Sequence, residues 1–397
     1  MKIAGVIAEY NPFHKGHALQ LAQLRELGYT HIAVAMGGHF LQRGSAAVCQ
    51  KQLRARMALE NGADLVVELP ASWACAPAQR FAAGGVALLE ALGCHTLAFG
   101  SECGDLALLQ QAAQAAQSEA VLSLTQQLMA DGRTFAAARQ AAVAQCFPGP
   151  AADVLQNPND NLGLEYLQAL AKQHCTMQPL ALRRVGAAHD APQAVEGIAS
   201  ASRIRELLED GNWEEAAALM PDAAWRTLRG AIAANRAPAS LHRAESAVLA
   251  RLRTMTSADF AALPDLSEGL EHRLYGAARQ ACSLEECYQL AKTKRYTLAR
   301  IRRLTLAAFL GLRREELPDL PPYLRVLGFN DRGKELMAAA KEKHTLPLSH
   351  SLSRLEELGG ACAATAALEA RAADLYGLMT PVPLPCGEEY RAQVVSL

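Results

Sequence analysis

The segment His14-Lys15-Gly16-His17 places two imidazoles and a glycine in one short loop. An apolar run that predicts a strand precedes it, and helical apolar spacing follows it. A helix that begins at such a loop points free backbone N–H groups and its positive dipole end toward an anion. The imidazoles can flank the same anion and donate hydrogen bonds. The segment predicts a phosphate site, and an ordinary helix cap is the alternative.

A second anion site is predicted where Ser200 to Arg205 opens a helix that runs to Gly211. Ser200 or Ser202 can cap this helix, and its N-terminus again favours a phosphate. A triphosphate held at both ends, with Arg205 or Arg184 on the leaving pyrophosphate, fits adenylyl transfer better than nucleotide sensing. We predict four catalytic residues, and they must lie together in space: His14, His17, Ser202 and Arg205.

The ends of other predicted strands supply further candidate residues for the nucleotide site. Arg43 follows a glycine-rich turn, and Gly100 would let adenine or ribose approach the backbone. The asparagines of segment 157–161 predict a helix N-cap with a turn, and one of them is a candidate nucleotide contact. Arg183 and Arg184 end the last predicted strand, where phosphate would lie, although a surface charge pair is the alternative.

The elements that position these residues alternate between strand and helix. Predicted strands are 2–10, 31–36, 64–69, 95–99 and 178–185, and residues 105–147 read as a helical insertion before the last of them. Such alternation implies a parallel sheet with ligands beyond its carboxyl ends. After about residue 211 the strand signals stop. The predicted fold class is α/β: a Rossmann-like parallel sheet in residues 1–210, followed by an all-α helical domain in residues 211–397.

Composition limits the classes of function. The 397 residues are 51% hydrophobic, and the formal net charge is −1, so a nucleic-acid surface must come from local clusters of Lys and Arg. The start reads as no signal peptide, and no run of about 18 apolar residues occurs, which predicts a cytoplasmic protein without a membrane partner. No cluster of metal ligands is evident, so we assign no metal residues. Mg²⁺ would be held by the ATP phosphates and water.

One helical stretch is strongly basic. No acidic residue lies between Glu286 and Glu315, and six cations gather there beside Tyr296: Lys292, Lys294, Arg295, Arg300, Arg302 and Arg303. They predict contact with a phosphodiester backbone, with internal salt bridges as the alternative for some of the arginines. The following segment, Pro321 to Asn330, suits either stacking on an unpaired base or packing between domains.

Several strings, in order along the chain, resemble those of the bacterial tRNA(Met) cytidine acetate ligase family, within the nucleotidyltransferase superfamily. The strings are EYNPFHKGH, FLQRG, MALENGADLVVELP, FGSE, NPNDNLGLEY, IASASRIR, EGLE, KTKRYTLARIRRL and PPYLRVLGFN. The resemblance implies that acetate and ATP form acetyl-adenylate, and that the acetyl group passes to N4 of the wobble cytidine of elongator tRNA(Met).

The resemblance also implies an ATP site. It comprises Ile7, Ala8, Glu9, Tyr10, Asn11, Pro12, Phe13, His14, Lys15, Gly16, His17, Ala18, Leu19, Gln20, Gly100, an asparagine (Asn159 or Asn161) and an arginine (Arg183 or, preferably, Arg184). One departure stands out, because Gly37 and His39 replace the serine and asparagine expected there. This puts side-chain roles at those two positions in doubt.

Two rival functions remain at this stage. An adenylyltransferase acting on a small phosphorylated metabolite would share the nucleotide site but needs no RNA surface. An RNA-binding module that holds a nucleotide without catalysis would release no pyrophosphate.

Overall fold

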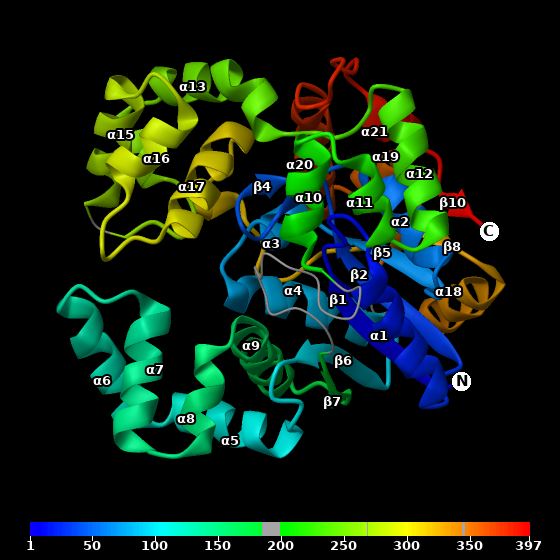
Figure 1. Cartoon of the computed structure of the whole chain (residues 1–397), viewed down its shortest axis with the longest axis horizontal. Coiled ribbons are helices and arrows are strands. Elements are labelled where there is room, and N and C mark those ends of the chain that lie inside the picture. Colours follow the sequence, from blue (N-terminus) through cyan, green and yellow to red (C-terminus); the bar gives the residue numbers. More distant parts are fainter. Residues whose placement is uncertain (185–198, 268, 344–345) are drawn as a thin grey trace.

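A mixed eight-stranded sheet forms the centre of the computed structural model, which describes residues 1–184, 199–267, 269–343 and 346–397 (Figure 1). The strand order is β10-β8-β5-β2-β1-β6-β7, with β9 paired to β8. The bounds are β1 (Ile3–Ala8), β2 (His31–Gly37), β5 (Leu65–Leu69), β6 (Thr96–Ser101), β7 (Gln178–Arg183), β8 (Leu324–Phe329), β9 (Leu348–Ser349) and β10 (Val395–Ser396). β3 (Phe40–Leu41) and β4 (Ser45–Ala46) form a separate antiparallel pair.

The five strands predicted from the sequence are all present and pair in parallel. Only Val185, at the end of the last predicted strand, lies outside the described residues. Successive side chains of β2 enter different cores, Ala33 and Ala35 on one face and Ile32 and Val34 on the other. The sheet is thus buried on both faces, as a parallel sheet with helical crossovers requires.

Helices cover the two faces. Those packed in the core on one face include α4 (Ala78–Ala91) and α9 (Pro158–Lys172), and α3 (Ala71–Ala74) precedes them. The core on the other face includes α1 (Lys15–Glu26), α2 (Lys51–Leu59), α10 (Ala201–Glu209), α11 (Trp213–Ala218) and α12 (Asp222–Ala233).

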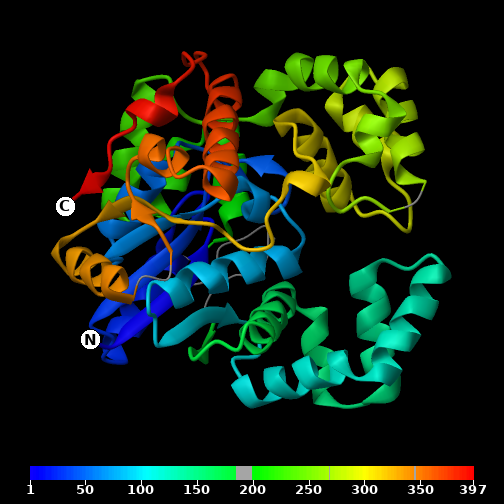
Figure 2. The same cartoon turned by 180° about the vertical axis from the view of Figure 1, so that it is seen from behind.

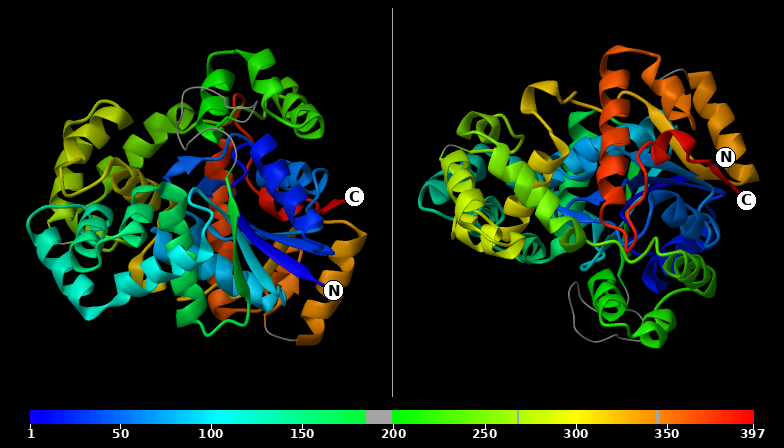
Figure 3. Two further views of the ribbon diagram at one scale, coloured as in Figure 1. Left: turned by 60° about the horizontal axis from the view of Figure 1, so that its bottom comes forward. Right: turned by 90° about the horizontal axis from the view of Figure 1, so that it is seen from above.

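Two groups of helices project from the same side of the sheet (Figures 1 and 2). The predicted insertion between β6 and β7 contains α5 (Leu106–Gln117), α6 (Glu119–Ala130) and α7 (Phe135–Cys146), followed by α8 (Pro150–Asp153). The second group has its own apolar core and contains α13 (Glu245–Thr254), α14 (Ser257–Ala261), α15 (Leu270–Gln280), α16 (Leu284–Ala291) and α17 (Leu298–Leu310). Further views in Figure 3 show the two groups beside each other.

The fold class is confirmed as α/β with a following helical region, but the chain does not stay helical after residue 211. β8 joins the central sheet antiparallel to β5, and β10 pairs with β8 at the edge. The helices of this last part are α18 (Asp331–Lys343), α19 (Leu352–Glu356), α20 (Gly360–Gly377) and α21 (Glu388–Arg391). The sequence analysis missed β8 because Pro321-Pro322 and Gly328 gave its short apolar run the character of a turn.

A buried charge network explains how β8 is tolerated in the core. Arg325 of β8 contacts Glu68 of β5 at 3.1 Å and also Glu389, which Lys51 contacts at 2.7 Å. All four side chains are almost fully buried, so each charge needs a partner. Burial also raises the pKa of the neighbouring Glu369 carboxyl well above its ordinary value. The network therefore ties the C-terminal segment to α2 and β5.

Among the described residues, no helix has the length and apolarity that crossing a bilayer demands.

Candidate active site

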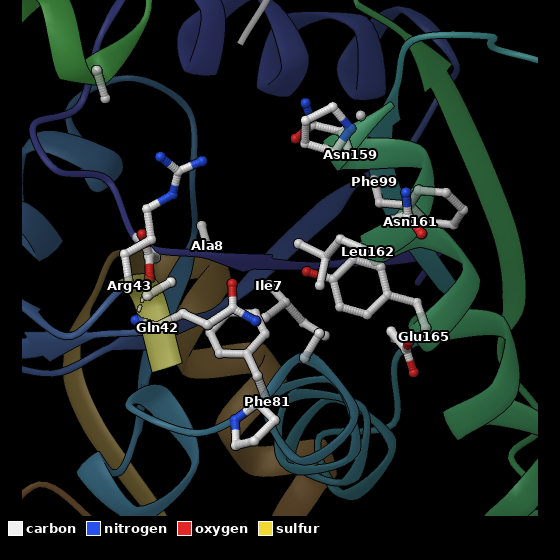
Figure 4. A pocket seen from close by; sticks show the side chains of 18 of the residues that line it. Ile7, Ala8, Gln42, Arg43, Phe81, Phe99, Asn159, Asn161, Leu162 and Glu165 are labelled. Carbon is white, nitrogen blue, oxygen red and sulfur yellow. Dashed lines mark hydrogen bonds between the residues drawn. The ribbon is translucent and has the colours of Figure 1, made fainter. Parts of the chain in front are cut away.

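A cavity of about 1130 Å³ lies beyond the carboxyl ends of β1, β6 and β7. Ligands of open parallel sheets bind at this edge, where crossovers leave a crevice. Figure 4 shows Asn161, Leu162 and Glu165 of α9 on one side of the space and Gln42 and Arg43 on the other. The cavity also reaches both projecting helical groups, through residues 134–136 and 297–300.

His14 and His17 lie at the start of α1, and backbone hydrogen bonds fix the tautomer of each ring. Nδ1 of His14 accepts from the Gly16 N–H at 3.1 Å, and Nδ1 of His17 accepts from the His14 N–H at 3.2 Å. This reciprocal capping box leaves the proton of each neutral ring on Nε2. The two rings stack with centroids 3.7 Å apart.

The electrostatic surroundings keep both imidazoles neutral. Burial, with the charges of Arg184 and Arg205, lowers the pKa of His14 to about 3. Burial, followed by His14 and Arg184, lowers the pKa of His17 well below its ordinary value. At neutral pH the rings are uncharged N–H donors, and the nearby guanidiniums supply positive charge for an anion.

The start of α10 meets this loop. Ser200 caps the helix by accepting from the Arg203 N–H at 3.2 Å. Arg205 donates to the backbone oxygen of Asn11 at 2.7 Å and to Ser202 Oγ at 3.1 Å. The sequence analysis required this proximity, and the structure has it. Two helix N-termini therefore face one cavity.

Arg184 crosses the end of β6 beside the histidines. A Cβ at Gly100 would lie 3.2 Å from Arg184 Cγ, so the glycine leaves room for that side chain. Arg183 also lines the cavity, and its side chain packs against Gly104. Its neighbour Arg184 is the residue whose charge acts on both imidazoles.

The asparagine segment begins α9, and its members have different surroundings. Asn157 occupies the predicted N-cap position, but its side chain donates to Asp160 Oδ2 and accepts no capping hydrogen bond from the helix backbone. Asn161 donates to the Leu155 oxygen at 2.5 Å and accepts from Arg139 at 3.2 Å. Asn159 donates to Glu102 Oε1 at 2.5 Å. Since both ends of the Asn161 amide have protein partners, Asn159 is the better candidate for a ligand.

Comparison with known proteins matches residues 1–388 to the HIGH Nucleotidyl Transferase family. A tRNA(Met) cytidine acetate ligase from Syntrophomonas wolfei is 36% identical over 400 residues, covering 96% of each chain. One from Acetivibrio thermocellus is 33% identical over 417 residues, covering 100% of both. The chain belongs to the tRNA(Met) cytidine acetate ligase family.

Solved structures of the family agree with this assignment. Thermotoga maritima TmcAL in its apo form has a TM-score of 0.94 and 30% identity, with 100% of both chains covered. The same protein bound with alpha-thio ATP has a TM-score of 0.92 at the same identity and coverage. The resemblance drawn from the sequence motifs is therefore confirmed.

Most of the predicted site residues line the cavity. They are Ile7, Ala8, Glu9, Tyr10, Asn11, His14, Gly16, His17, Leu19, Gln20, Gly100, Asn159, Asn161, Arg183, Arg184, Ser202 and Arg205. Pro12, Phe13, Lys15 and Ala18 do not line it. Phe13 is fully buried below the loop, Lys15 is exposed, and Ala18 packs against the core on the α1 face of the sheet.

The departures at Gly37 and His39 lie outside the cavity wall. His39 is 5% exposed and stacks on Tyr376 at 4.4 Å. Burial lowers its pKa well below the ordinary value. The cavity is instead reached by Gln42 and Arg43 of the same turn. His39 thus packs against α20, whereas a Cβ at Gly37 would meet Leu41 and Ala74.

The basic stretch divides into two kinds of cation. Arg300 and Arg303 both contact Asp265, at 3.5 and 3.2 Å, and are less than a quarter exposed. Lys292, Lys294 and Arg295 are exposed. The alternative of internal salt bridges is therefore realised for Arg300 and Arg303, and Arg302 contacts Glu285 at 3.6 Å while staying 41% exposed.

The segment Pro321 to Asn330 has no exposed aromatic. Tyr323 is 0% exposed, and Arg325 is 2% exposed inside the charge network. Stacking of Tyr323 on a base is thus excluded, and the packing alternative holds. Ile198 and Glu268, of two motifs quoted above, lie outside the described residues.

Two parts of the site were missed by the sequence analysis. Arg54 is fully buried and donates to the backbone oxygens of Glu9 at 2.6 Å and Gly37 at 3.1 Å, which fixes the ends of β1 and β2. Arg139 of the insertion pairs with Glu165 at 2.6 Å in the cavity wall. Glu165 lies within a quoted motif, NPNDNLGLEY, whereas Arg54 and Arg139 carry no local signal.

Proposed function

We propose that the protein activates acetate with ATP and transfers the acetyl group to N4 of the wobble cytidine of elongator tRNA(Met). One observation supports this proposal above all: the His14–His17 loop and the Ser200–Arg205 helix start line the same cavity. This cavity extends to the basic stretch. A triphosphate needs donors at both ends, and an acyl transfer to RNA needs a path from the nucleotide to a cationic surface.

In the first step, an acetate oxygen attacks the α-phosphorus of ATP. The bond from the α-phosphorus to the bridging oxygen breaks, and pyrophosphate leaves with the electron pair. Nε2–H of His14 and His17 donates to the phosphate oxygens on which charge develops. Each ring is neutral because its pKa is lowered, and its single proton lies on Nε2 because Nδ1 accepts a backbone N–H. Arg184 and Arg205 stabilise the departing pyrophosphate.

In the second step, the cytidine amino nitrogen attacks the acetyl carbonyl carbon. The carbon–oxygen bond to AMP breaks, AMP leaves, and the nitrogen loses one proton. Both steps use the same contacts to the α-phosphate, because that group is attacked in the first step and leaves as part of AMP in the second. Ser202 contributes its hydroxyl, which Arg205 orients at 3.1 Å.

We further propose the ATP contacts residue by residue. The β1–α1 loop from Ile7 to Gln20, Gly100, Asn159 and Arg184 hold the nucleotide, and Asn161 and Arg183 support them. Mg²⁺ accompanies the ATP phosphates, with water as its remaining ligands. Among the described residues, no group of three acidic, histidine or cysteine side chains is arranged to hold a metal ion.

We assign catalysis and tRNA binding to the two predicted domains, except that part of the second domain belongs to the central sheet. Residues 1–210 bind ATP and catalyse, while the tRNA-binding part of residues 211–397 comprises α13 to α17. The rest of the C-terminal half completes the catalytic sheet through β8. With tRNA and ATP as substrates, the enzyme works in the cytoplasm.

The test is acetate-dependent incorporation of label from radioactive acetate into tRNA in the presence of ATP. The proposed ligase forms N4-acetylcytidine and releases pyrophosphate and AMP. The rival adenylyltransferase would instead transfer AMP to a phosphorylated metabolite and leave tRNA unlabelled, and a non-catalytic module would release no pyrophosphate.

A further inference from the structure

Phe135, the first residue of α7, is an exposed aromatic in the cavity wall. Thirteen large hydrophobic side chains are exposed in the described part of the chain, and among those thirteen Phe135 alone lines the cavity. Single exposed apolar side chains on a convex surface need no explanation. An aromatic ring that is 42% exposed within a concave site is different, because rings of this kind stack on unpaired bases.

The ring is supported from within the insertion. The Arg139 guanidinium carbon lies 5.1 Å from the Phe135 ring centroid. Arg139 is held in turn by Glu165 at 2.6 Å and Asn161 at 3.2 Å, both on α9. Because α9 is packed in the sheet core, the position of Phe135 is fixed relative to the nucleotide site.

A second observation also points to a ligand in this wall. Nε of Arg139 is buried and has no hydrogen-bond partner among the described residues, although Arg139 is only 7% exposed. Leaving a buried donor unpaired costs free energy that an acceptor on a ligand would offset.

Cations lie on both sides of the opening. Arg133 is exposed two residues before Phe135, and Arg295 and Arg302 line the cavity from the other helical group. A strand of RNA entering between the two groups would have its phosphates near these side chains and a base near the ring.

We propose that Phe135 stacks on the cytosine whose amino group receives the acetyl group. The inference rests on the function proposed above. Stacking uses the face of the base and leaves its edge free, so the amino nitrogen can reach the acetyl carbonyl. The helical insertion is then a second tRNA-contacting arm, opposite the basic stretch.

The test compares Phe135→Ala, Phe135→Trp and a matched control, Phe147→Ala. Phe147 caps the other end of α7, is 44% exposed and does not line the cavity. We expect Phe135→Ala to lower kcat/KM for tRNA by about tenfold to a hundredfold, the worth of one stacked base. Acetate-dependent ATP–pyrophosphate exchange stays unchanged, Phe135→Trp retains transfer, and Phe147→Ala equals the wild type.

A tRNA that lacks the target base provides the second half of a double-mutant cycle, in which loss of the ring is combined with loss of the base. Wild type and Phe135→Ala should bind it equally, whereas they differ on intact tRNA. Equal kcat/KM of Phe135→Ala and wild type on intact tRNA would overturn the inference. A parallel loss of pyrophosphate exchange would overturn it too, because the ring would then contact ATP. Failure of the wild type to acetylate tRNA would instead sink the proposed function.

Discussion

The floor of the cavity and its rim hold their charged and polar groups in opposite ways. On the floor, His14, His17 and Arg205 are fixed by backbone contacts, and none of the three is fully exposed, so their directions are set in advance. On the rim, Lys294 and Arg295 are exposed. Preorganised donors act on a transition state, whereas exposed cations act on binding and its salt dependence.

The largest expected effect is on the floor. His17→Asn keeps an acceptor in the place of Nδ1 but removes the Nε2 donor, and we expect acetate-dependent pyrophosphate exchange to fall by about a hundredfold to a thousandfold. His17→Gln restores a donor near Nε2 and should recover part of this loss. Equal activity of the two variants would show that the donor is irrelevant.

The fold of these variants needs its own measurement. The His17 ring packs against Tyr10 at 4.8 Å and Phe13 at 5.5 Å, so a smaller side chain removes some packing. Circular dichroism and thermal unfolding of both variants separate this effect from chemistry, since Asn and Gln both replace the aromatic ring with an amide.

A smaller effect is expected on the rim. Arg295→Glu combined with Arg302→Glu should raise KM for tRNA about tenfold. Pyrophosphate exchange should stay unchanged, because the proposed partners of this pair are the tRNA phosphates and not ATP. The slope of log affinity against log salt should also fall by about 0.7 to 0.9 for each phosphate that the variant no longer neutralises. tRNA binding at several salt concentrations measures both.

A charge-matched control comes from α18, at the far edge of the sheet (Figure 1). Arg332→Glu with Lys341→Glu changes the net charge equally at exposed positions outside the cavity wall. If this variant weakened tRNA binding as much as the rim variant, general charge and not a local surface would govern binding.

The lowered pKa of His14 should also make the free energy of unfolding depend on pH. The His14 pKa is about 3 in the folded chain and near its ordinary value of about 6.5 when unfolded, so between these values the unfolded state binds more protons. The free energy of unfolding therefore falls as pH drops below 6.5, by about 1.4 kcal/mol per pH unit for this residue. His14→Asn keeps a capping side chain without titration, and its slope between pH 6 and 4 should be shallower.

Urea unfolding of wild type and His14→Asn over this pH range provides the measurement. A variant with Arg295→Gln and Arg302→Gln should keep the wild-type slope, because neither the arginines it removes nor the glutamines it introduces titrate in this pH range. Identical slopes for wild type and His14→Asn would mean that His14 protonates in the folded chain.

The smallest effect is expected at the N-terminus of α10. Ser200→Ala removes the cap on the Arg203 N–H and should lower the free energy of unfolding by about 1 kcal/mol. Ser200→Thr retains a hydroxyl acceptor and should lose less. Denaturant unfolding compares them, and a stability loss in Ser200→Thr as large as in Ser200→Ala would mean that sterics, not the cap, matter at this position.

The sequence by itself determined the parallel strands, the first crossover loop and a serine cap of α10 at Ser200 or Ser202, of which the structure selected Ser200. These features rest on contacts within a few residues: apolar alternation, the capping box of His14 and His17, and a serine before a helix. Such local signals can be recognised in the amino-acid sequence without knowledge of the tertiary structure. The family motifs added the residues predicted to contact the nucleotide, most of which line one cavity.

The tertiary structure alone decided the rest. Arg300 and Arg303 are neutralised by Asp265, more than thirty residues away, and β8 is accepted into the sheet because Glu68 and Glu389 surround Arg325. Likewise, Phe135 reaches the cavity only because α7 packs back toward α9. Each of these depends on which distant segments meet, and no periodicity along the chain encodes that pairing.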